Sequence, residues 1–125
     1  MDEVPGTEAG GPPEDLGISP PNAEPGAARW ILVAHNRNVL KGWEWLCRNT
    51  PVDAQRCYAW LSQHATLPKP RRCYALKGKQ FAGCWGYEIG SANRVYYKPD
   101  ETDRKAVIFY AGPHPSGVPT PPKGL

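Results

Sequence analysis

The spacing of apolar positions changes once along the chain, from a helical period to a strand period. Residues 30–35, WILVAH, form a compact apolar run with β-branched side chains, which is typical of a buried strand. Over residues 36–49 the apolar positions recur at helical spacing, with Asn36 or Asn38 available as the helix cap. The predicted buried stripe of this first helix consists of Val39, Leu40, Trp43, Leu46 and Cys47.

A second helix is predicted over residues 50–65. Thr50 is its candidate cap, Pro51 takes the first helical position, and Asp53 lies in the first turn, where a negative charge is favourable. The break between the two helices is short, so they form a hairpin. The apolar stripe of the second helix consists of Ala54, Cys57, Tyr58, Leu61 and Ala65.

From Arg71 onward the pattern is that of strands joined by short turns. Residues 90–92 and 99–103 have turn composition, and short links favour antiparallel pairing of neighbouring strands. The sequence therefore predicts an α+β fold: an N-terminal strand, a two-helix hairpin and a four-stranded antiparallel meander, with one sheet face left open. The four strand candidates are residues 71–78, 84–90, 93–98 and 106–112.

Composition divides the chain into three parts. Residues 1–28 hold six acids and no Lys or Arg, are rich in Pro and Gly, and are predicted to form a disordered acidic tail. They match neither a secretory signal nor a transit peptide. Residues 29–115 are the expected folded domain, and residues 116–125 a loose Pro-rich tail. No apolar run approaches the length of a membrane span, so we expect a cytoplasmic protein without membrane contact.

Charge follows the same division. The first 28 residues carry −6, whereas the rest of the chain carries all 15 Lys and Arg against six acids, for +9. A basic domain favours a polyanionic partner, and the acidic tail can fold back over it and weaken that binding at low salt. The spacing of Cys47, Cys57, Cys73 and Cys84 suits neither a zinc site nor an obvious redox motif, so we expect buried reduced thiols and no metal or other cofactor.

The element order and the motifs over residues 74–114 resemble the RelE/ParE superfamily of toxins from bacterial type II toxin–antitoxin pairs. The resemblance rests on Leu76-Lys77-Gly78, the turn Gly90-Ser91-Ala92, the strand Arg94-Val95-Tyr96-Tyr97, and Val107-Ile108-Phe109-Tyr110 followed by Gly112 and His114.

The resemblance implies one of two activities. RelE-like members cut messenger RNA on the ribosome and block translation and growth, and we take this metal-independent endoribonuclease (mRNA interferase) activity as the leading hypothesis. ParE-like members bind DNA gyrase without cutting; in that alternative the toxic surface is the helix pair, including Arg48, Arg56 and Trp60. A plain basic nucleic-acid-binding domain is a third reading. A toxin implies a cognate antitoxin protein as partner.

RNA supplies its own 2′-hydroxyl nucleophile, so cutting needs a base, an acid and phosphate-binding cations. Arg94 matches the family's phosphate-contacting arginine; its structural alternative is an ion pair with Asp100 or Asp103. His114 is the candidate proton donor or acceptor, unless it simply faces water. Glu88 and Tyr87 are the candidates for the second proton-transfer group.

Further residues are candidates for binding RNA without taking part in proton transfer. The lysines and arginines among them can hold phosphates, with solvated basic loops as the alternative, and the tryptophan can stack on a base. These candidates are Lys77, Lys79, Arg71, Arg72 and Trp85.

Overall fold

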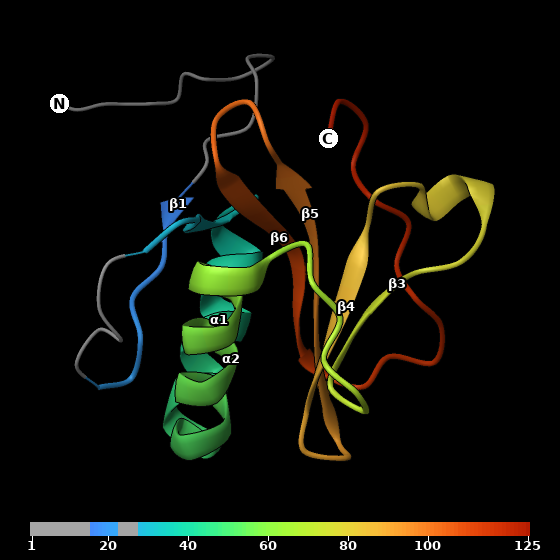
Figure 1. Cartoon of the computed structure of the whole chain (residues 1–125). Coiled ribbons are helices and arrows are strands. Elements are labelled where there is room, and N and C mark those ends of the chain that lie inside the picture. Colours follow the sequence, from blue (N-terminus) through green and yellow to red (C-terminus); the bar gives the residue numbers. More distant parts are fainter. Residues whose placement is uncertain (1–15, 23–27) are drawn as a thin grey trace, which may run out of the picture.

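The computed structural model describes residues 16–22 and 28–125. They form two helices on one face of a sheet, with the C-terminal segment running along the other face (Figure 1). The predicted α+β class and element order are confirmed. The elements are β1 (Leu16–Gly17), β2 (Ile31–Ala34), α1 (Arg37–Asn49), α2 (Pro51–His64), β3 (Cys73–Ala75), a 3₁₀ turn at Lys79–Phe81, β4 (Trp85–Ile89), β5 (Asn93–Asp100) and β6 (Lys105–Pro113).

The sheet has the strand order β1-β2-β6-β5-β4-β3. Strands β3 to β6 form the predicted antiparallel meander, and β2 joins its β6 edge in parallel. The helix hairpin supplies the long crossover that a parallel pair requires. The register shifts between Tyr96 and Tyr97, so that Phe109 and Tyr110 both lie opposite Tyr96 on one face.

The main core lies between the helices and the sheet. Asn36 caps α1 by accepting a hydrogen bond from the Val39 amide at 3.0 Å, as one of the two predicted caps. The predicted stripes of both helices are confirmed, with Trp43, Leu46, Cys57 and Leu61 among the fully buried side chains. Thr50 does not cap α2, because its hydroxyl donates back to the Leu46 carbonyl at 2.9 Å.

The prediction of a disordered tail over residues 1–28 is wrong for residues 16–22. Leu16 and Gly17 pair with β2, Ile18 is buried in the main core, and the Ser19 carbonyl accepts the indole N–H of Trp43 at 2.9 Å. Two aliphatic side chains and several hydrogen bonds thus fix this stretch despite its Pro-rich surroundings. The remainder of the predicted tail, residues 1–15 and 23–27, lies outside the described residues.

The prediction of a loose tail over residues 116–125 is also wrong, because this segment covers the sheet. Val118 and Leu125 pack on a second apolar cluster, formed by buried Cys84, Tyr96 and Phe109. The Lys98 ammonium donates to the Leu125 carbonyl at 2.6 Å. The segment has no helix or strand of its own, yet apolar contacts and this bond hold it in place.

Cys57, Cys73 and Cys84 are buried free thiols, and Cys47 is a half-buried one, as expected from their spacing. Among the residues that the structure describes, no helix is long and apolar enough to cross a membrane.

Candidate functional site

The sheet face away from the helices, here called the open face, carries a charged row at the end of β4 and the start of β5. The register pairs Glu88 with Arg94 and Arg94 with Gly112. Because side chains alternate along a strand, and because Tyr87, Ile89 and Val95 pack in the helix-side core, Glu88 and Arg94 point to the opposite face. A guanidinium and a carboxylate predicted for the site are therefore side by side.

Arg94 is nearly buried and held by three contacts. One of its terminal nitrogens donates to the carbonyls of Asn93 at 2.8 Å and Ser91 at 3.2 Å, while the other lies 3.8 Å from a Glu88 carboxylate oxygen. The predicted alternative partners Asp100 and Asp103 lie at the far end of β5, so the ion pair forms with Glu88 instead. Opposite Arg94, Gly112 has a φ of +152°, a conformation that favours glycine, and a Cβ there would lie 3.4 Å from the Tyr110 hydroxyl.

His114 joins this end of the sheet through its backbone. Its amide donates to the Ala92 carbonyl at 2.7 Å, so it follows β6 directly beside the start of β5. Its Nδ1 lies 2.6 Å from the Pro115 carbonyl, an arrangement that requires Nδ1 to be the donor. The other ring nitrogen, Nε2, is then the one available for proton transfer, on a side chain exposed to solvent.

A row of tyrosines crosses the open face next to the charged row. Tyr74 pairs with Gly86, Gly86 with Tyr96, and Tyr96 with Tyr110. Burial, and then the Glu88 carboxylate, raise the pKa of Tyr74, so its phenol stays protonated beside the site. The sequence did not single out Tyr74, because its place near Glu88 depends on the pairing of β3 with β4.

Tyr87 and Trp85 are predicted site residues that the structure does not bring to the charged row. Both pack in or against the helix-side core, on the opposite face from Glu88 and Arg94. The reason is the parity of the strand: residues 85, 87 and 89 share one face, while 86 and 88 share the other. Burial raises the pKa of Tyr87 far above its ordinary value, so this phenol is a poor proton donor or base.

The predicted basic residues divide into two groups. Arg71 and Arg72 lie in the turn before β3, where the Arg72 carbonyl accepts the Glu88 amide at 2.7 Å, so they border the charged row. Lys77 and Lys79 are exposed in the loop between β3 and β4, beyond the Ala75–Trp85 pair. Three strand residues, roughly 10 Å, separate Trp85 from Glu88, so these lysines lie away from the charged row.

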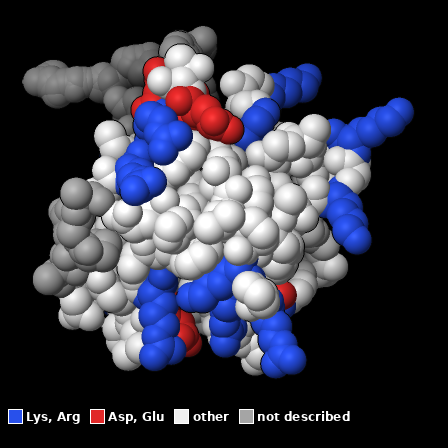
Figure 2. All heavy atoms as spheres, viewed as in Figure 1, with Lys and Arg blue, Asp and Glu red and all other residues white. Residues whose placement is uncertain are grey.

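Lys and Arg side chains gather at the end of the molecule where the helix hairpin and the β4–β5 turn lie (Figure 2). The charged row, Arg71, Arg72 and Arg56 of α2 belong to this end. Other Lys and Arg side chains lie at the opposite end and along one side of the same face, but only this end contains the charged row.

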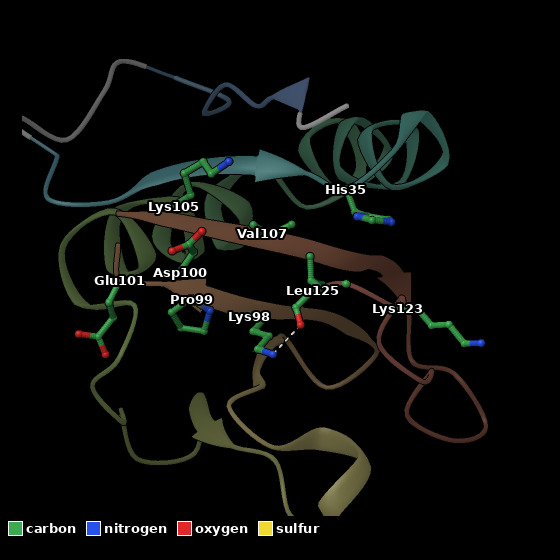
Figure 3. Close-up of a pocket in the computed structure, with 10 residues that line it drawn as sticks. His35, Lys98, Pro99, Asp100, Glu101, Lys105, Val107, Lys123 and Leu125 are labelled. Carbon is green, nitrogen blue, oxygen red and sulfur yellow. Dashed lines mark hydrogen bonds between the residues drawn. The ribbon is translucent and has the colours of Figure 1, made fainter. Parts of the chain in front are cut away.

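A larger hollow, of about 660 Å³, lies at the other end of β5 and β6, between the strands and the C-terminal segment. Figure 3 shows that its charged side chains do not converge: Lys98 bonds to Leu125, and Lys123 points away. His35 lines it with a buried Nδ1 that has no hydrogen-bond partner among the described residues. This hollow contains none of the residues of the charged row.

Three of the solved structures that match this chain are of the same kind. The toxin–antitoxin complex YoeB–YefM from Staphylococcus aureus matches in two structures, one of them a heterotetramer, each with 15% identity over 70% of this chain and 100% of the matched chain, at a TM-score of 0.54. A YoeB/ParE toxin from Agrobacterium tumefaciens matches with 17% identity over 67% of this chain and 98% of the toxin, at a TM-score of 0.52. No protein-family model matches, and no curated protein does. The chain thus has the fold of the YoeB/ParE toxins, as the sequence resemblance implied.

Proposed function

We propose that this chain is the toxin of a toxin–antitoxin pair and that it cuts messenger RNA on the ribosome, which blocks translation and growth. The observation that carries the proposal is the placement of Glu88, Arg94 and His114 at one end of the open face. The fold is that of a YoeB/ParE toxin and of the YoeB–YefM toxin–antitoxin complex, which supports a cognate antitoxin as partner.

The three groups fit the steps of RNA cleavage by the internal 2′-hydroxyl. The Glu88 carboxylate takes the 2′ proton, and the 2′ oxygen attacks the phosphorus. Arg94 holds a phosphate oxygen as negative charge develops. The bond to the 5′ oxygen breaks, and His114, protonated on Nε2, donates a proton to that oxygen. The products are a 2′,3′-cyclic phosphate and a 5′-hydroxyl, so atoms and charges balance.

Ordering of the groups supports this assignment of roles. Arg94 is fixed by two backbone carbonyls, and a phosphate would replace or share its contact with Glu88. His114 is restrained by the Pro115 carbonyl, which costs less entropy on substrate binding than a free side chain. Tyr74 keeps a protonated phenol near Glu88 and is available to hydrogen-bond the substrate.

The test is a cleavage assay with purified protein, translating ribosomes and a messenger RNA whose ends are mapped. Glu88→Gln and His114→Gln keep the side-chain size and remove proton transfer, so each is expected to slow cutting by roughly 10²–10⁴-fold. Glu101→Gln is the matched control, because this exposed acid lies in the turn between β5 and β6; it is expected to cut at the parent rate. Asp103→Asn controls for the loss of an acid elsewhere.

Two results would reject the proposal. Undiminished cutting by both Glu88→Gln and His114→Gln would remove their roles. Growth arrest without any RNA cleavage, together with resistance mutations in gyrase, would favour the ParE-like alternative, in which the exposed helix surface with Arg48 and Arg56 is the functional one.

A further inference from the structure

Two small hollows lie beside α2, and the first includes Glu88 of the charged row. The first, of about 210 Å³, lies between α2 and the β3–β4 edge, and the second, of about 290 Å³, continues along α2. They share Arg56 and Lys69, so they form one groove, here called the α2 groove. Its remaining lining is Asp53, Arg72, Tyr87 and Glu88 in the first hollow and Ala59, Trp60, Gln63 and His64 in the second.

We propose that the α2 groove binds single-stranded RNA next to the cleavage site, with phosphates on Arg56, Lys69 and Arg72 and a base stacked on Trp60. This inference rests on the proposed function, because it names the path by which the same substrate would leave the charged row. It assigns RNA binding to Arg56 and Trp60 of α2, which the sequence analysis named only as part of a gyrase-binding surface.

The charges of the groove favour an anion. Arg56 pairs with Asp53 at 3.6 Å, but its side chain is 70% exposed and can turn toward a ligand. The other acid, Glu88, is engaged with Arg94, so Lys69 and Arg72 remain as cations in excess over the two acids. A water occupies about 30 Å³ in the liquid, so the first hollow has room for a phosphate and its ribose.

The aromatic part of the groove is held in position. The Trp60 indole donates to the Leu67 carbonyl at 3.3 Å, and its ring lies 4.5 Å from the His64 ring. Lys69 lies over the Trp60 ring at 5.1 Å, which places a cation beside the aromatic surface. Alternating cations and aromatic rings are the usual pattern of single-strand binding, because every base has a face that stacks.

The groove and the charged row lie on different sides of β4 and meet at Glu88 and Arg72. Glu88 lines the first hollow and also pairs with Arg94. Arg72 borders both, since its guanidinium lies 3.5 Å from the Glu88 carbonyl and its own carbonyl accepts the Glu88 amide. An RNA strand with one phosphate on Arg94 would pass around the sheet edge at Arg72 to place the following phosphates in the groove.

The test is binding of a short fluorescent single-stranded RNA, methylated at its 2′-hydroxyls so that it cannot be cut, measured by anisotropy over a range of salt. Arg56→Ala with Lys69→Ala is expected to weaken binding at least several-fold and to lower the salt slope by about 1.4, the value for two lost phosphate contacts. Arg37→Ala with Lys41→Ala removes the same charge from the exposed surface of α1 and is expected to bind like the parent. Trp60→Ala is expected to weaken binding without changing the slope, and Trp60→Phe to restore it.

The outcomes separate this inference from the proposed nuclease. Parent-like binding by the Arg56/Lys69 variant overturns the groove even if the parent cuts RNA. Weakened binding with an unaltered control supports the groove even if the parent does not cut. Equal binding of duplex RNA, or no RNA binding by the parent, also overturns it, and in the latter case loss of antitoxin binding by the variant would assign the surface to a protein partner.

Discussion

Arg94 is a cation with little exposure, and its neighbours explain how it is kept there. Removing a guanidinium from water is costly unless its donors find acceptors. Two carbonyls of the β4–β5 turn and the Glu88 carboxylate provide them. The same contacts orient the planar group, which suits it to a phosphate. Arg94 stabilises the β4–β5 turn and also takes part in the proposed chemistry, so Arg94→Ala would change stability and activity together and is a poor probe of function.

Gly42 makes a contact that no other residue could make. A Cβ at this position of α1 would lie 2.0 Å from the Ala111 carbonyl oxygen of β6. Gly42→Ala is therefore expected to lower the free energy of unfolding by at least about 2 kcal/mol, because backbone must move apart. This exceeds the gain of about 1 kcal/mol that alanine brings to a helix. Denaturant unfolding of the two proteins measures the difference.

Gly117→Ala is the control for this substitution, because nothing lies within 4 Å of the Cβ that it would add. Its free energy of unfolding should stay within about 0.5 kcal/mol of the parent's. A Gly42→Ala protein as stable as the parent would mean that α1 and β6 are not packed as closely as described.

At the scale of elements, the sequence predicted each helix and each meander strand to within a few residues. Periodicity is a local property, and the stripe from Val39 to Leu46 records it directly. The sequence also named Arg94 and Glu88 as site residues, but it did not predict that Tyr87 and Trp85 face the helices. Adjacent residues such as Tyr87 and Glu88 point to opposite faces of the sheet, and which of the two faces the core depends on tertiary packing. The α2 groove was not predictable from the sequence, because Arg56 and Arg72 are far apart along the chain and only the tertiary fold brings them to one hollow.

The interface between α2 and the sheet predicts a loss of stability in alkali. Burial raises the pKa of the Cys57 thiol well above its ordinary value of 9.0, and burial also raises the pKa of Tyr87 and Tyr97. A pKa raised in the folded state means that the folded state holds its proton more tightly. The contribution to stability is full below the ordinary pKa and is lost as the pH rises above it.

The melting temperature is accordingly expected to stay level up to about pH 9 and to fall above it. Tyrosinate absorbance should show Tyr87 and Tyr97 ionising only as the protein unfolds. Cys57→Ala should flatten the decline, because it removes one of the titrating groups. A melting temperature that does not change between neutral and strongly alkaline solution would contradict the buried placement of these groups.

At the scale of the whole molecule, the C-terminal segment contributes to the sheet that it covers. Deleting residues 116–125 removes Val118 and Leu125 from the cluster of Cys84, Tyr96 and Phe109. We expect a lower melting temperature and stronger binding of a hydrophobic dye, because an aromatic surface becomes exposed. Val118→Asp, which keeps the length, should give part of the same effect. Unchanged stability in both variants would mean that the segment does not rest on the sheet.

The acids of residues 1–28 can affect the whole molecule, because they are on the same chain as the basic domain. Deleting residues 1–28 would be a confounded experiment, since it also removes β1, the buried Ile18 and the bond from Trp43 to Ser19. Deleting residues 1–15 removes five of the six acids and leaves those contacts in place. If these acids compete for the basic end of the domain, the shortened protein should bind the uncut RNA more tightly at low salt. The gain should fade as added salt screens charges beyond about 10 Å at 0.1 M. Replacing the five acids by Asn and Gln at full length should reproduce the gain, whereas equal affinity of all three proteins at low salt would leave the tail without a role in binding.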